Sequence, residues 1–133
     1  MTFALDTNLL VRLLTNDDAA QAARVEAWLV ANATPQAPAY VDHVVLCELG
    51  WVLESSYAYS RAHVHGAIAA LLEYDMLSVE SPALVQQALR WFAAGPADFS
   101  DYLLAARARS AGCAAVLTLD RKAAKTATHR LLK

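Results

Sequence analysis

The sequence lacks the features that mark membrane and secreted proteins. Although 57% of its 133 residues are hydrophobic, no apolar run approaches the roughly 20 residues that a membrane-spanning helix requires. The N-terminal segment has no basic stretch, apolar core and cleavage site in series, so we predict no signal peptide. Cys47 and Cys113 both lie in apolar surroundings, which predicts buried free thiols. We therefore expect a cytoplasmic protein with no membrane segment.

Motifs of several enzyme classes are also missing. The chain has no GxxxxGK[ST] phosphate loop and no GxSxG elbow, so P-loop nucleotide hydrolysis and serine hydrolase chemistry lack support. Its four histidines show neither HExxH nor a Cys/His zinc spacing. No repeat or low-complexity linker divides the sequence, so residues 1–133 are predicted to form one domain.

Short apolar strands alternate with longer helices along the chain. Strands are predicted at 2–6, 39–41, 77–79 and 115–119, with a weak last strand near the C-terminus. Helices are predicted at about 8–15, 18–32, 42–56, 60–74, 82–94, 98–110 and 121–125. The helix starts are marked by Asp17-Asp18, Asp42, Ser60 and Pro82. This alternation predicts an α/β fold, a three-layer α/β/α sandwich with a central short-stranded parallel sheet.

Acids follow several predicted strands directly. Asp6, Asp42 and Asp120 hold such positions, and ligands of parallel sheets bind beyond the carboxyl ends of the strands. Two strand-terminal acids that converge on one edge suggest a site. For Asp6 the ordinary alternative is a helix N-cap, although Thr7 or Asn8 could fill that role equally well and leave Asp6 free.

Glu48 lies inside the predicted helix DHVVLCELGWVLES. Its neighbours three and four residues away are all large and apolar: Val44, Val45, Trp51 and Val52. We therefore expect Glu48 on the face that packs against the sheet. A buried carboxylate is costly unless it is paired, protonated or bound to a metal, and no lysine or arginine lies between residues 25 and 60. The alternatives are a side chain that reaches the helix edge or a partner from a distant segment.

A fourth acidic position lies at the start of the helix 98–110. Asp98 and Asp101 are three residues apart there, and capping is expected to explain one of them and to leave the other for a different role. Together with Asp6, Glu48 and Asp120, this position supplies oxygen donors of the kind that Mg²⁺ or Mn²⁺ prefers. Such an ion can activate water and stabilise the charge of a phosphoryl transition state.

The net charge of −2 conceals a basic C-terminal quarter. From Arg107 to Lys133 there are seven lysines or arginines and one acid. This composition suits a polyanion near this end of the chain, although ordinary solvated helix faces would produce it as well. The candidates for contacts with the phosphates of such a polyanion are Arg121, Lys122 and Lys125.

Four motifs in register resemble the PIN-domain family, specifically the VapC-like toxins of type II toxin–antitoxin pairs. The motifs are LDTNLLVRLL, CELGWVL, ADFSDYLLAARARSAGC and VLTLDRKAAK, and the similarity extends from Thr2 to about Leu132. The resemblance implies an α/β/α sandwich and an endoribonuclease that depends on Mg²⁺ or Mn²⁺. It also implies an RNA substrate, a VapB-like antitoxin as partner and a homodimer.

The resemblance also assigns the site residues. Matched motif by motif, the catalytic acids are Asp6, Glu48, Asp101 and Asp120. Asp6, Asp101 and Asp120 would bind the metal, and Glu48 would be an outer ligand or orient the attacking water. The positions that line the site are Thr7, Asn8, Asp98 and Thr118.

Three alternatives remain open. A phosphatase of the haloacid-dehalogenase type also begins with a strand-terminal aspartate, but it requires a second aspartate where this chain has Asn8. A non-catalytic RNA- or protein-binding module would need the carboxylates to be incidental, which Glu48 argues against. A PIN-like RNA-processing nuclease outside a toxin–antitoxin pair would share the site but not the partner.

Overall fold

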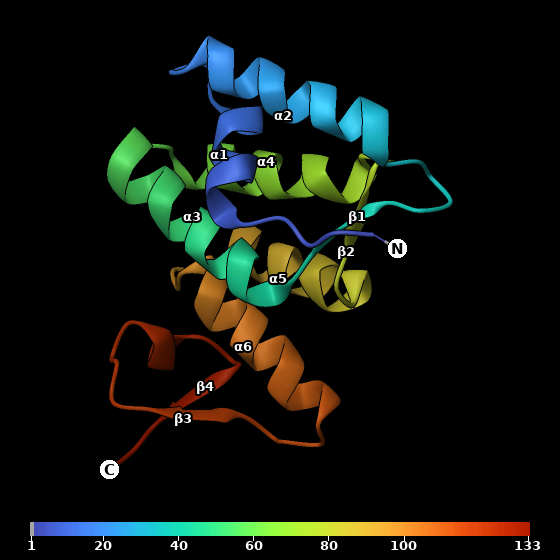
Figure 1. Cartoon of the computed structure of the whole chain (residues 1–133). Helices are drawn as coiled ribbons and strands as arrows, with labels where there is room; N and C mark the ends of the chain where they lie inside the picture. The colour runs from blue at the N-terminus through green and yellow to red at the C-terminus, as the bar shows by residue number, and fades with distance from the viewer. Residues whose placement is uncertain (1) are drawn as a thin grey trace. The chain divides into compact units, whose positions relative to one another are not determined.

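The computed structural model describes residues 2–133 of the chain. They form two compact units, the first ending at Glu80 and the second covering Ser81–Lys133. Across these residues there are six α-helices, one 3₁₀ helix and four short strands, labelled in Figure 1. No helix among residues 2–133 combines the length and the apolar character needed to cross a membrane.

Parallel strand pairing organises the first unit. Strand β1 (Ala39–Val41) pairs in parallel with β2 (Leu77–Val79). The strand predicted at 2–6 is shorter than expected, because only Ala4 forms a bridge, which is parallel, to Tyr40 of β1. The reason is local: Asp6 already begins the first helix, so few residues remain to pair with β1.

Four helices complete the first unit: α1 (Thr7–Leu14), α2 (Ala19–Asn32), α3 (His43–Tyr57) and α4 (Arg61–Glu73). Helix α1 packs against both α2 and α3 (Figure 1). The predicted caps are confirmed, because Asp18, Asp42 and Ser60 each accept a hydrogen bond from a backbone N–H in the first turn. The core contains leucines with no exposed surface: Leu10, Leu29, Leu46, Leu49 and Leu53.

The second unit pairs two helices with a second parallel sheet. Helix α5 (Pro82–Ala94) packs against α6 (Phe99–Ser110), and β3 (Val116–Thr118) pairs in parallel with β4 (His129–Leu131). Because the paired strands of both units are parallel and alternate with helices, the predicted α/β class is confirmed. The predicted last strand also exists.

Two predictions are wrong, one for the second unit and one for the two cysteines of the chain. The helix expected at 121–125 is a turn followed by the short 3₁₀ helix η1 (Ala123–Lys125). Within residues 2–133 neither cysteine forms a disulfide, but Cys113 is exposed and Cys47 only half-buried, so the predicted burial is wrong. Cys113 follows Gly112, whose φ of +93° ends the helical path after α6, so its apolar sequence neighbours do not enclose it.

A polar network joins the end of α1 to the end of α3. The Tyr57 hydroxyl donates to Asp17 Oδ2 at 2.7 Å, and the Thr15 hydroxyl donates to Asp17 Oδ1 at 2.8 Å. Arg12 Nη1 lies 3.2 Å from the same Oδ1. The hydrogen bond from Tyr57, followed by that from Thr15, lowers the pKa of Asp17 below its ordinary value of 3.8.

This network predicts a specific acid sensitivity. Because the folded pKa of Asp17 lies below its unfolded value, its stabilising contribution is present at neutral pH and disappears as the pH falls through the lowered pKa. We expect the melting temperature of the wild type to fall more steeply below about pH 4 than that of Asp17→Asn. Circular dichroism melts against pH measure this, with Glu26→Gln on the exposed side of α2 as the control. Parallel pH profiles for wild type and Asp17→Asn would contradict the assignment.

Candidate active-site carboxylates

Asp6 forms the N-cap of α1. Its Oδ1 accepts a hydrogen bond from the backbone N–H of Thr7 at 2.7 Å. The expectation that Thr7 or Asn8 would cap the helix in its place is therefore wrong. Asp6 is exposed, and no donor among residues 2–133 bonds its Oδ2. The cap thus fixes the carboxylate while one oxygen stays available to a ligand.

The two polar residues after Asp6 have different environments. Thr7 is only 6% exposed, and its hydroxyl has no hydrogen-bond partner among residues 2–133. Asn8 is exposed. Buried hydroxyls are usually paired, so Thr7 offers an unused hydrogen-bonding group directly beside the Asp6 cap.

Glu48 lies on the exposed face of α3, and the predicted packing face is wrong. The helix buries the opposite side, with His43, Leu46, Leu49 and Leu53 as buried members. Val44 and Trp51, which share the face of Glu48, are 67% and 69% exposed. Since α3 is apolar almost all round, its periodicity did not identify the buried side. The argument from burial therefore does not apply to Glu48, whose carboxylate faces solvent.

Asp98 and Asp101 act together at the start of α6. Asp98 is the N-cap, and its backbone N–H donates to Asp101 Oδ2 at 3.2 Å as part of a capping box. Capping therefore involves both acids, whereas the sequence suggested that it would explain one. Asp101 is half-buried, and no donor among residues 2–133 bonds its Oδ1.

Asp120 organises the turn that follows β3. Its Oδ1 accepts from the backbone N–H groups of Lys122 at 2.9 Å and Ala123 at 3.4 Å. Its own N–H donates to the hydroxyl of Thr118 at 2.9 Å. Thr118 therefore supports the turn that orients the Asp120 carboxylate, and Oδ2 of Asp120 has no donor in the described chain.

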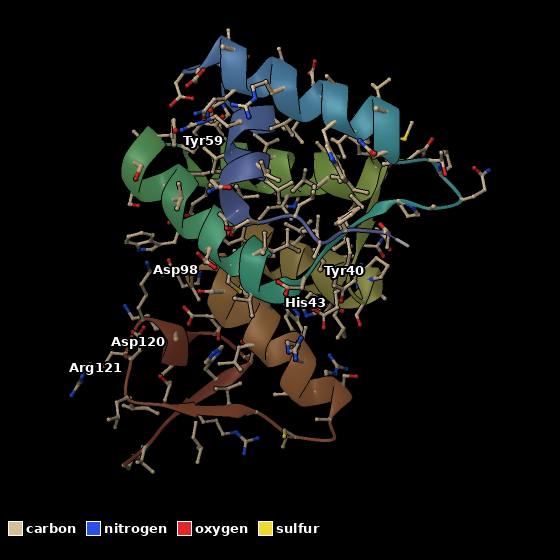
Figure 2. All side chains as sticks on the ribbon, viewed as in Figure 1. Tyr40, His43, Tyr59, Asp98, Asp120 and Arg121 are labelled. Atoms are coloured by element: carbon tan, nitrogen blue, oxygen red, sulfur yellow. The ribbon has the colours of Figure 1, made fainter. Side chains whose placement is uncertain are left out.

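The basic residues of this turn differ in their contacts. Lys122 Nζ lies 3.8 Å from Asp98 Oδ1, so an exposed ion pair joins the turn after β3 to the start of α6. Such surface pairs contribute little to stability, typically about 0–1 kcal/mol. Arg121 and Lys125 are exposed, and Figure 2 shows Arg121 extending away from the turn that carries Asp120.

The three predicted metal ligands share one arrangement. Asp6, Asp101 and Asp120 each hold one oxygen in a hydrogen bond to a backbone N–H at the start of a helix or turn. Within neither unit does the described chain gather three or more His, Cys, Asp or Glu side chains into a metal-binding group. Their hard oxygen donors, each with one free oxygen, fit Mg²⁺ or Mn²⁺ by chemistry.

One further strand-terminal acid was not identified from the sequence. Glu80 follows β2, and its carboxylate accepts from the backbone N–H of His43 at 2.8 Å. Its carbonyl oxygen lies 2.7 Å from His43 Nε2, and Figure 2 shows His43 at the start of α3. The pattern of a strand followed by an acid, which identified Asp6, would have found it. These contacts give Glu80 a structural role in tying the end of β2 to α3.

The family of the chain follows from a match that covers both units. A family model described as "PIN domain" matches residues 3–128. The chain belongs to the PIN domain family. The predicted resemblance and the α/β sandwich fold that it implies are thereby confirmed, and all the predicted acids of this PIN chain lie inside the matched range.

Similarity to a curated protein agrees with this assignment. The PIN chain is 22% identical over 118 residues to a VapC ribonuclease of Aquifex aeolicus (strain VF5). The aligned region covers 89% of this chain and 87% of that relative. The similarity therefore extends over most of both proteins and is not limited to one motif.

Proposed function

We propose that this chain is an endoribonuclease that depends on Mg²⁺ or Mn²⁺ and acts as the toxin of a VapC-like toxin–antitoxin pair. The observation that carries the proposal is the shared arrangement of Asp6, Asp101 and Asp120, each anchored through one oxygen with the other free. The PIN match and the similarity to a VapC ribonuclease support RNA as the substrate. Because that match spans both compact units, we also propose that residues 1–133 act as one nuclease domain.

In this proposal the acids have two different roles, metal binding and orientation of the attacking water. The free oxygens of Asp6, Asp101 and Asp120 would hold the divalent cation, and the hydrogen bonds that their other oxygens accept from backbone N–H groups keep the carboxylates oriented. When bound, the cation supplies an activated water and stabilises charge on the phosphate. The exposed carboxylate of Glu48 orients the attacking water or serves as an outer ligand. Thr118 and Asp98 hold the segments that carry Asp120 and Asp101.

RNA phosphates would be attracted by the basic segment around η1. Arg121 and Lys125 are exposed cations in this segment, and Lys122 could exchange its exposed pairing with Asp98 for a phosphate. Contacts of this kind release counterions from the RNA, so binding should weaken as salt is added.

The VapC-like assignment also leads to proposals about binding partners and cellular location. We propose a VapB-like antitoxin, a homodimer and a cytoplasmic location. The apolar side chains of Val44 and Trp51, 67% and 69% exposed on α3, support a surface for a protein partner. The similarity to a VapC ribonuclease supports the toxin–antitoxin setting.

The test compares RNA cleavage in the presence of Mn²⁺ with cleavage in the presence of the chelator EDTA. We expect single-stranded RNA to be cut with Mg²⁺ or Mn²⁺ and to stay intact with EDTA. Glu48→Gln should reduce the rate by about 10–100-fold, the typical cost of losing a group that orients a metal site. Glu54→Gln on the same helix is the matched control and should keep the wild-type rate. Gel analysis of a labelled oligonucleotide measures both.

Other results would redirect the assignment. RNA binding without cleavage under any metal condition would indicate a non-catalytic binding module. Phosphate release from a small phosphomonoester, with RNA intact, would indicate a phosphatase. Cleavage that persists undiminished in EDTA would contradict the metal requirement.

A further inference from the structure

The first unit contains an open cavity of ≈ 920 Å³ between the segment before α1, α1 itself and α2. Figure 1 shows these two helices lying against each other. The volume falls in the range of about 300–1,000 Å³ that is typical of sites for small organic ligands. The side chains relevant here are Phe3, Asn8, Arg12, Gln21, Arg24 and Trp28.

Among residues 2–133, the side chains that line the cavity include two arginines and no acid, and one of the arginines is free. Arg12 is engaged by Asp17 and Tyr57, but Arg24 is exposed and has no hydrogen-bond or ion-pair partner among residues 2–133. An anionic group bound in the cavity would therefore find its partner in Arg24.

An aromatic surface lies on the same helix face as this cation. Trp28 follows Arg24 by four residues, the spacing of neighbours on one side of a helix. Trp28 is half-buried, and its ring centroid lies 5.6 Å from that of Phe3 at an interplanar angle of 80°. Aromatic side chains next to a cation are the combination by which proteins bind the bases and phosphates of single-stranded nucleic acids.

Amide groups add hydrogen-bonding capacity to the wall. Asn8 and Gln21 line the cavity. Asn8 offers both a donor and an acceptor to the edge of a base, whereas Gln21 offers its NH₂ group, because its amide oxygen already accepts from Arg12 Nε. Asn8 also lies two residues after Asp6 on the same helix start. A nucleotide held here would be bound close to that carboxylate along α1.

We propose that this cavity binds one nucleotide of a single-stranded RNA, with the base against Trp28 and a phosphate at Arg24. The inference rests on the proposed function, because it assigns a substrate subsite to the nuclease. A purely apolar helix of a protein partner would cover Arg24 without providing a counter-charge, which is costly. A nucleotide supplies both the anion and the flat ring.

The experiment measures binding without cleavage. A fluorescently labelled single-stranded oligoribonucleotide is titrated in EDTA, and its anisotropy gives the affinity over a series of salt concentrations. Arg24→Glu should weaken binding about tenfold and lower the slope of log affinity against log salt by about 0.7, the value for one phosphate contact of a single strand. Trp28→Leu should weaken binding by a similar factor, and Trp28→Phe should restore most of it.

A matched control separates the subsite from general charge effects. Arg90→Glu on the exposed side of α5 makes the same change in net charge outside the cavity and should stay within about twofold of wild type. If Trp28→Leu fails to fold, Arg24→Glu still decides, because the Arg24 side chain has no partner in the described chain. Wild-type affinity and salt slope in Arg24→Glu would overturn the proposal.

Failure of the subsite and failure of the proposed function give different results. Metal-dependent cleavage by the wild type, with undiminished RNA binding by the cavity variants, would reject the subsite alone. RNA binding that depends on Arg24 and Trp28, without cleavage under any metal condition, would reject the nuclease and retain the site. Absence of RNA binding by the wild type would reject both.

Discussion

Asp6→Asn is expected to reduce metal-dependent RNA cleavage by more than about 100-fold, because loss of even a group that only orients a metal ligand typically costs about 10–100-fold. The substitution separates two roles of this residue. The amide oxygen of asparagine can still accept the hydrogen bond from Thr7 N–H, so the cap of α1 survives. The carboxylate charge is lost, and the oxygen offered to the metal is replaced by an NH₂ group, which cannot bind a cation. Cleavage of a labelled oligonucleotide under saturating Mn²⁺ measures the effect.

Thermal melts provide the readout that does not depend on catalysis. A cation that binds only the folded state raises the melting temperature of the wild type, and the rise grows with the ratio of the free cation concentration to its Kd. Asp6→Asn should keep the melting temperature of the metal-free protein and lose most of the rise produced by Mn²⁺. Asp6→Ala removes the cap as well and should cost about 0.5–2 kcal/mol without metal. Undiminished cleavage and an undiminished Mn²⁺ effect in Asp6→Asn would remove Asp6 from the site.

Gly95→Ala is expected to destabilise the second unit by about 1–3 kcal/mol, the usual cost of overpacking. A Cβ at Gly95, which ends α5, would overlap the hydroxyl group of Tyr102. The Tyr102 side chain is 2% exposed and its hydroxyl accepts from the N–H of Ala97, so the ring has little room to move. Tyr102 directly follows Asp101 on α6, so its displacement should also lower RNA cleavage.

The matched control for this substitution lies in the first unit. Gly66 is inside α4, and a Cβ there would meet no atom within 4 Å. Gly66→Ala should therefore stabilise the protein by about 0.5–1 kcal/mol, because alanine has the lower entropic cost in a helix. Chemical denaturation of both variants measures the opposite signs. A similar stability change in the two variants would show that the contact with Tyr102 does not matter.

Local patterns in the sequence were sufficient to predict where most helices begin and to which family the chain belongs. Asp18, Asp42 and Ser60 cap the helices predicted to follow them, and Pro82 begins α5 as expected. The four motifs identified the PIN resemblance, which the match over residues 3–128 confirms. A cap acts on a backbone N–H only a few residues away, so the sequence alone contains the information.

The candidate site was predicted only in part. Asp6, Asp98, Asp101 and Asp120 were selected as acids at the ends of strands and the starts of helices, and the structure finds them there. The sequence could not decide that Asp6 would cap its own helix, because Thr7 and Asn8 were equally suitable caps. Nor did it single out Arg24 and Trp28, because a cavity exists only where two helices meet.

The sequence by itself determined the α/β class, the order of the elements, most helix starts and the identity of the candidate acids. Tertiary structure decided which side of α3 is buried, and hence that Glu48 is exposed beside Trp51. It also decided that the segment before α1 pairs through Ala4 alone. The physical reason is range: capping and helix periodicity act within a few residues, whereas burial and strand pairing depend on segments far apart in the chain.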